Sequence, residues 1–83
     1  MAVTTKEEIT SLLERGKSVG ATHVIVVWDK GEMTNYPVFV LPHENAREKA
    51  GRYNDESNEV MEVYSLSRDW EVQLNEQRAF NCD

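Results

Sequence analysis

The chain has 83 residues, with 15 acids against nine lysines and arginines, and its formal net charge is −6 at pH 7. This length makes one domain, Met1–Asp83, with no room for a second core. The acidic balance, without a basic stripe, argues against direct nucleic-acid binding, and the single cysteine, Cys82, excludes an internal disulfide.

The first element is predicted to be a helix that begins after Thr5. Thr5 and Glu8 form a capping-box pattern, and acids in the first turn complement the helix dipole. An apolar stripe follows at helical spacing, made of Ile9, Leu12 and Leu13, which Val19 would extend. Gly16 and Gly20 are the two candidate positions for the end of this helix.

Two strands of a hairpin are predicted next. THVIVVWD, residues 22–29, is apolar and β-branched at consecutive positions, which is typical of a central strand that is buried on both faces. KGEMTN, residues 30–35, has the composition of a hairpin loop, and YPVFVL, residues 36–41, is the second strand. Because Pro37 has no N–H, we expect one side of that strand to be an edge, and Pro42 ends it.

A second helix and a third strand follow. HENAREKAGRY, residues 43–53, places Ala46, Ala50 and Tyr53 on one helical face. Met61 and Val63 alternate with Glu62, which favours a strand over residues 59–65, although a helix is an open alternative for this segment. At a sheet edge, Glu62 would keep the outer face of this strand in contact with solvent, and its charge would discourage uncontrolled strand pairing.

The last element is predicted to be a helix with Ser67 as its N-cap and with acids in its first turn. Trp70, Leu74 and Arg78 follow at helical spacing. Val72 falls outside that face, and an apolar residue on a second face indicates a second contact, such as a homodimer partner.

The elements together predict an α+β fold with the chain order α-β-β-α-β-α. The strand at residues 22–29 is the most apolar and should be central. The second helix provides a crossover past it, so that a three-stranded, mainly antiparallel sheet has the strand order 2-1-3.

Motifs for phosphate loops and zinc sites do not occur in the sequence. His23 is better explained as a packed histidine, and His43 as a cap of the second helix with Glu44, than as catalysts. Asp29 and Glu32 could weakly hold a divalent cation, but a hairpin turn explains them. We therefore expect no enzyme activity, no cofactor and no metal.

The negative charge is concentrated in the last third of the chain. Residues 1–53 carry seven acids and seven bases, whereas residues 54–83 carry eight acids and two bases. Complementary charge would favour a protein partner with a basic surface. The expected partner-binding residues are Glu59, Glu62, Asp69, Trp70, Glu71, Leu74 and Glu76.

Three segments resemble a group of short, uncharacterised proteins encoded by bacteriophages and bacterial chromosomes: GATHVIVVWD, YPVFV and EVMEVYSLSRDWEVQLNEQRAF. The resemblance covers most of the chain from Gly20 to Phe80. The resemblance implies a biological setting. It implies no activity, cofactor or catalytic residue. Small accessory proteins of mobile elements often act by binding a host protein.

The leading hypothesis is a non-enzymatic interaction protein, a phage-borne inhibitor of a host defence or other host protein that acts through the acidic C-terminal surface. A more specific form of this hypothesis is that the carboxylates imitate phosphates. The alternative is a small-molecule-binding protein, with a pocket at a homodimer interface where Arg47, Lys49 and Arg52 could attract a nucleotide. A plain structural or regulatory domain is a third reading. The polar start shows no signal peptide and the longest apolar run is too short for a membrane span, so we expect a cytoplasmic location.

Overall fold

The computed structural model describes residues 5–76 and 79–82. The elements follow one another as α1 (Lys6–Ser18), β1 (His23–Asp29), β2 (Thr34–Val40), α2 (Ala46–Gly51), β3 (Asn58–Ser65) and α3 (Trp70–Leu74). The strands form one sheet in the order β2-β1-β3, and both neighbours pair antiparallel to β1. The predicted fold and strand order are therefore confirmed, and the helical alternative for residues 59–65 is wrong.

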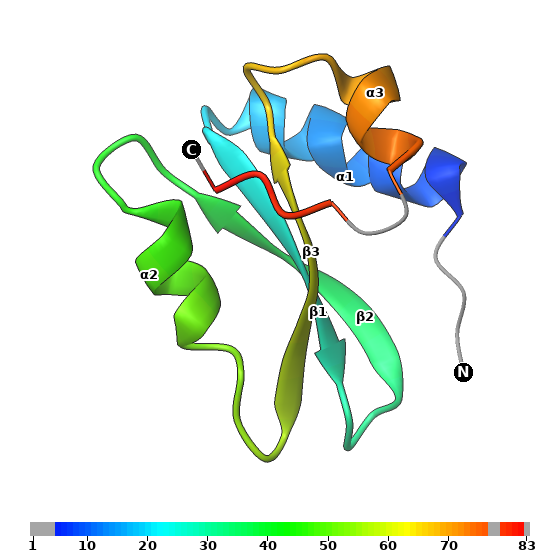
Figure 1. Cartoon of the computed structure of the whole chain (residues 1–83), viewed down its shortest axis with the longest axis vertical. Helices are drawn as coiled ribbons and strands as arrows, with labels where there is room; N and C mark the ends of the chain where they lie inside the picture. Colours follow the sequence, from blue (N-terminus) through cyan, green and yellow to red (C-terminus); the bar gives the residue numbers. More distant parts are fainter. Residues whose placement is uncertain (1–4, 77–78, 83) are drawn as a thin grey trace.

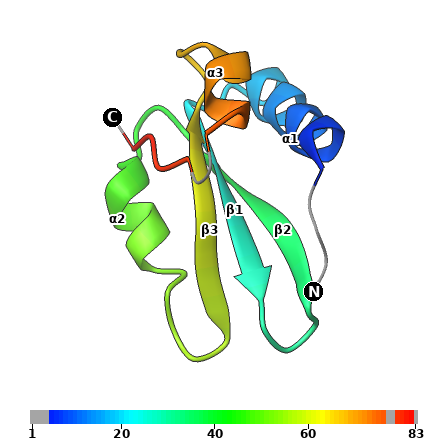
Figure 2. The same ribbon diagram turned by 45° about the vertical axis from the view of Figure 1, so that its right-hand side comes forward.

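The sheet has helices on both of its faces (Figure 1), and it separates two hydrophobic cores. One face packs against α2, and the other packs against α1 and α3; Figure 2 shows these helices on opposite sides of the sheet. All four residues from Val24 to Val27 in β1 are at most 1 % exposed, because successive side chains enter different cores. Burial on both faces explains why this strand is continuously apolar rather than alternating.

A β-bulge redirects the side chains of β3. The register with β1 shifts between Val26 and Val27, which leaves Met61 as the extra residue. Val60 and Val63 consequently both belong to the core beneath α2, whereas Met61 packs against the other core. The alternation predicted for Met61 and Val63 is therefore interrupted, because the bulge sends these two side chains to opposite faces.

The first helix begins as predicted and ends at one of the two candidate glycines. Thr5 Oγ1 accepts a hydrogen bond from the N–H of Glu8 at 3.1 Å. Gly20 has a φ of 78°, and its N–H donates to the carbonyl of Lys17, which closes the helix in a Schellman motif. Val19 does not extend the apolar stripe, because it is the C-cap residue and is 57 % exposed.

The two shorter helices begin at different caps from those predicted. Asn45, not His43, caps α2, and Asp69, not Ser67, caps α3; each side chain accepts from the N–H three residues ahead. Asn and Asp are among the strongest N-cap residues, and each lies directly before its helix. His43 is exposed, and the Ser67 hydroxyl lies 3.1 Å from that of Ser65.

The other candidate glycine, Gly16, lies inside α1, where the helix approaches β1 too closely for a side chain. A Cβ at this position would lie 2.7 Å from Cγ2 of Val24, which is fully buried. We expect Gly16→Ala to lower the free energy of unfolding by about 1–3 kcal/mol, because overpacking outweighs a gain of about 1 kcal/mol in helix propensity.

Gly51→Ala in α2 is the matched control, since a Cβ there meets nothing within 4 Å. This variant should keep the wild-type stability or gain up to about 1 kcal/mol. Denaturant unfolding of the two variants measures the difference. If Gly16→Ala were as stable as Gly51→Ala, the close packing of α1 on β1 would be refuted.

Candidate functional site

The outer edge of β3 is occupied by the C-terminal segment and by a side chain. The N–H of Val63 donates to the carbonyl of Ala79 at 2.9 Å, and its carbonyl accepts from the N–H of Asn81 at 3.0 Å. Beyond this bridge, Gln73 Oε1 accepts from the N–H of Ser65 at 2.7 Å, and Gln73 Nε2 donates to the carbonyl of Ser65 at 2.8 Å. The Gln73 amide thus takes the place of a peptide group in a fourth strand.

The first part of β3 is bonded to the loop that precedes it. Asn58 donates its N–H to Asp55 Oδ1 and accepts from the N–H of Asp55, both at 2.9 Å. The N–H of Val60 donates to Asn54 Oδ1 at 2.9 Å. Hydrogen bonds from the amides of Ser57 and Asn58 lower the pKa of Asp55. Consequently β3, although an edge strand, offers few unpaired backbone groups to another strand.

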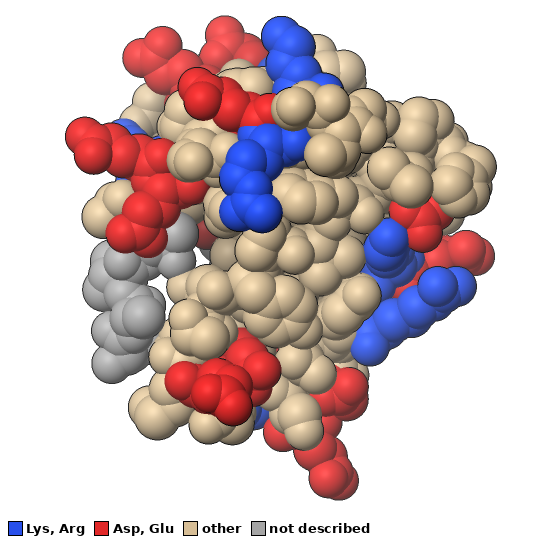
Figure 3. All heavy atoms as spheres, turned by 180° about the vertical axis from the view of Figure 1, so that it is seen from behind, with Lys and Arg blue, Asp and Glu red and all other residues tan. Residues whose placement is uncertain are grey.

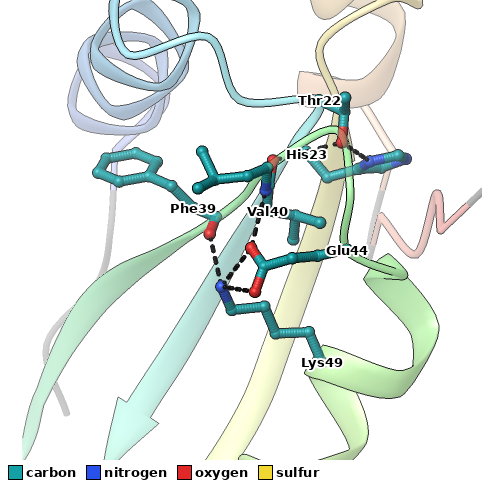
Figure 4. Close-up of polar contacts among 7 residues, drawn as sticks. Thr22, His23, Phe39, Val40, Glu44 and Lys49 are labelled. Carbon is teal, nitrogen blue, oxygen red and sulfur yellow. Dashed lines mark hydrogen bonds and ion pairs between the residues drawn. The ribbon is translucent and has the colours of Figure 1, made fainter.

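The opposite edge, formed by β2, is obstructed at Pro37 and at Phe39, and Figure 4 shows the second of these positions. Pro37 has no N–H, and the carbonyl of Phe39 accepts from Lys49 Nζ at 3.0 Å. The same ammonium group forms an ion pair with Glu44 at 2.7 Å, and Glu44 Oε1 also accepts from the N–H of Leu41. The hydrogen bond from Lys49 lowers the pKa of Glu44. Strand addition at β2 would have to disrupt this arrangement.

Two of the predicted partner-binding acids, Glu62 and Glu76, converge on Tyr64. The Tyr64 hydroxyl donates to Glu62 Oε2 at 2.7 Å. Burial, then the hydrogen bond and charge of Glu62, and then the charge of Glu76 raise the pKa of Tyr64. Asp69 and Glu71 are both exposed at the start of α3, but Asp69 is partly engaged because it caps this helix.

The other predicted contact residues lie apart from this pair. Glu59 is exposed near the beginning of β3, toward the opposite end of the molecule from α3 (Figure 1). Trp70 and Leu74 pack against the core that α1 covers, so the apolar face that they form is turned inward. The exposed apolar residue of α3 is Val72, which is 61 % exposed. The predicted continuation of this face to Arg78 lies outside the described residues.

The first turn of α1 adds acids that sequence reasoning did not assign to the site. Lys6 Nζ donates to Asn75 Oδ1, so this turn lies beside the end of α3. Glu7 and Glu8 are exposed there, and Figure 3 shows acidic side chains gathered over the start of α1. The helix dipole alone accounted for both acids in the sequence, because the packing of α1 on α3 is a tertiary contact. We define the α1–α3 surface as Glu7, Glu8, Glu62, Glu71, Val72 and Glu76.

The basic residues of α2 and its C-cap are Arg47, Lys49 and Arg52. Lys49 is held by Glu44, and Arg47 is exposed. Arg52 borders a groove of about 190 Å³ whose lining is His43, Glu44, Asn45, Glu48, Lys49 and Arg52. Glu44 and Glu48 share this lining with Lys49 and Arg52, so the groove has no excess of positive charge with which to attract an anionic nucleotide. The pocket predicted at a homodimer interface stays a prediction.

The remaining candidate residues have local roles. His23 Nδ1 lies 2.9 Å from Thr22 Oγ1 (Figure 4). Asp29 Oδ1 accepts from the N–H groups of Gly31 and Glu32, which is the turn predicted for this segment. Cys82 is half-buried against the core beneath α2. Within residues 5–76 and 79–82, no group of three or more His, Cys, Asp or Glu side chains is arranged to hold a metal ion.

Comparisons with protein-family models, with curated proteins and with solved structures each found no match. Among the described residues, no helix is both long enough and apolar enough to cross a membrane. The resemblance to phage and bacterial proteins stays a prediction. The basis for a functional proposal is therefore the surface geometry.

Gln73 provides a test of how the C-terminal part of the chain is held. Gln73→Leu would leave the buried N–H of Ser65 without a partner and would remove one of the two donors to its carbonyl, the other being the N–H of Arg68. We therefore expect a loss of about 1–3 kcal/mol in the free energy of unfolding. Asn75→Leu is the matched control, because it also replaces an amide by leucine. It removes the contact with Lys6, but both residues are exposed, so stability should change by less than about 1 kcal/mol. Similar midpoints for the two variants in denaturant unfolding would contradict the role of Gln73.

Proposed function

We propose that this chain is a non-enzymatic interaction protein that binds a partner with a basic surface through the α1–α3 surface. The observation that supports it most directly is Val72, an apolar side chain that is 61 % exposed on a helix whose neighbouring exposed residues include Glu71 and Glu76. A partly apolar centre within a polar rim is the usual anatomy of protein interfaces.

The two sheet edges support contact through side chains. Strand addition needs a row of unpaired N–H and carbonyl groups. Those of β3 are bonded to the Asn54–Asn58 loop, to Gln73 and to the C-terminal segment, and β2 is interrupted by Pro37 and Lys49. A partner is therefore expected to meet the helical surface rather than extend the sheet.

The charge of the α1–α3 surface supports a basic partner. Five of its six residues are glutamates, and they outnumber the ammonium group of Lys6 that lies beside them. Complementary charge accelerates encounter and disfavours acidic competitors. Salt should weaken this attraction, since the screening length at physiological ionic strength is about 8 Å.

The resemblance to proteins of phages and bacterial chromosomes supports the biological setting of this proposal. In that setting the partner is a host protein in the cytoplasm, a component of a defence system or of other host machinery. Binding at an acidic surface would then inhibit the partner by covering a basic region that it needs. In one form of this inhibition, the carboxylates occupy the positions on the partner that phosphates would otherwise occupy.

The test uses a partner captured from host lysate by the full-length chain and then purified. Replacing Glu8, Glu71 and Glu76 by glutamine should slow association by about tenfold, with a small effect on dissociation, because these charges act mainly before contact. The melting temperature should hardly change, since exposed substitutions usually alter stability by less than about 0.5 kcal/mol. Raising the salt concentration should reproduce the slower association of the variant.

The matched control removes the same charge elsewhere, by replacing Glu32, Glu48 and Glu56 with glutamine. These residues are exposed and lie outside the α1–α3 surface. The control should keep close to the wild-type association rate. Equal slowing by both triple variants, or binding that is indifferent to salt and to both, would overturn the assignment of this surface.

A homodimer, expected from the small size of the chain and from Val72, competes with the basic partner. It would bring Val72 of two copies together against the repulsion between their glutamates. Light scattering should then give twice the 9.6 kDa chain mass, and Val72→Asp should return the protein to a monomer. A monomer mass for the wild type at tens of micromolar, roughly the range where weak dimers form, would reject the dimer. That result would leave the α1–α3 surface open to a different partner.

A further inference from the structure

A groove of about 460 Å³ opens between the end of α1 and the loop that joins β3 to α3. Its lining consists of Lys17, Ala21, Thr22, His23, Leu66 and Ser67. The volume falls in the range of small-molecule sites, about 300–1,000 Å³. It lies at the C-terminal end of α1, whereas the contact of Lys6 with Asn75 marks the other end of this helix.

Backbone hydrogen bonds hold the walls of this groove in place. The N–H of Ala21 donates to the carbonyl of Gly16 at 2.9 Å, as part of the Schellman motif. The N–H of Leu66 donates to the carbonyl of Thr22 at 2.9 Å, which joins the two walls. Trp70 Nε1 donates to the carbonyl of Leu66 at 3.1 Å. A groove fixed in this way loses little conformational entropy when a ligand enters.

The lining combines an apolar wall with a few polar groups near one cation. Ala21 and Leu66 are half-buried and supply apolar surface, while Lys17 and Ser67 are exposed at the rim. Among the described residues, Lys17 has no ion-pair partner. The carbonyls of Lys17 and Gly16 accept hydrogen bonds from the turn that follows α1. These bonds reduce the partial negative charge that the end of the helix presents to the groove.

These features together point to the chemical class of the ligand. One ammonium group can balance a single negative charge, and a hydroxyl that lines the same groove can donate a hydrogen bond to it. Together they cannot balance a phosphate chain on a protein of net charge −6. We propose that the groove binds a small monocarboxylate with an apolar body. The carboxylate meets Lys17 and Ser67, and the apolar body covers Ala21 and Leu66. This site is independent of the proposed partner surface.

Octanoate is the probe, with octanol as the uncharged analogue of the same chain length, and amide chemical shifts of the full chain report binding. Octanoate should produce saturable shifts at Ala21, Thr22, Leu66 and Ser67. Lys17→Gln should weaken octanoate binding by about three- to fivefold and leave octanol unaffected, as expected for one exposed ion pair. Lys30→Gln, at the exposed hairpin tip, is the charge-matched control and should leave both affinities unchanged.

A second variant tests the apolar wall. Ala21→Phe should fill the groove and abolish the octanoate shifts, and the amide spectrum of the variant shows directly whether the fold is kept. The proposal is overturned by shifts that do not saturate or that lie outside the groove. Equal weakening of octanoate by Lys17→Gln and Lys30→Gln would overturn it as well, since the attraction would then be nonspecific.

Discussion

The side chains from Val24 to Val27 alternate between two cores, and each of the four is almost completely buried. A strand with this burial needs a hydrogen-bonded neighbour on both edges and a packed layer on both faces, because neither its backbone nor its side chains can be left to water. β2 and β3 fill the edges, α2 covers one face, and α1 with α3 covers the other. In a chain that buries only about 60% of its unfolded surface, one such strand organises most of the core.

Because β1 is the central strand, the two edges of the sheet belong to β2 and β3. The two are closed by different means: Pro37 and the Lys49–Glu44 pair obstruct β2, whereas the Asn54–Asn58 loop, Gln73 and the C-terminal segment bond β3. The surface left for recognition is then made of side chains on helices. That is why the proposed partner contact falls on α1 and α3, and why Val72 and the glutamates near it matter more than the sheet.

Local patterns allowed much of the fold to be predicted. The unbroken apolar run of β1 indicated a central strand, and Pro37 indicated an edge, which together give the strand order. Thr5 is predictable as a cap because its partner Glu8 is three residues away. The caps of the two shorter helices are predicted at His43 and Ser67, whereas the structure has them two residues further along the chain, at Asn45 and Asp69. The bulge at Met61, the pairing of Gln73 with Ser65 and the contact of Lys6 in the first turn of α1 with Asn75 depend on residues that are distant in the sequence. No local sequence pattern indicates these contacts, and so the α1–α3 surface was only partly predicted.

The closure of the β3 edge can be measured residue by residue through native-state hydrogen exchange. The amides of Val63, Ser65 and Asn81 should exchange only through global unfolding, at rates close to those of the β1 amides, because their acceptors are the carbonyl of Ala79, the side chain of Gln73 and the carbonyl of Val63. If the Ser65 and Val63 amides instead exchanged as fast as those of the exposed hairpin tip, the edge of β3 would be open. Recognition by strand addition would then replace the helical surface as the better account.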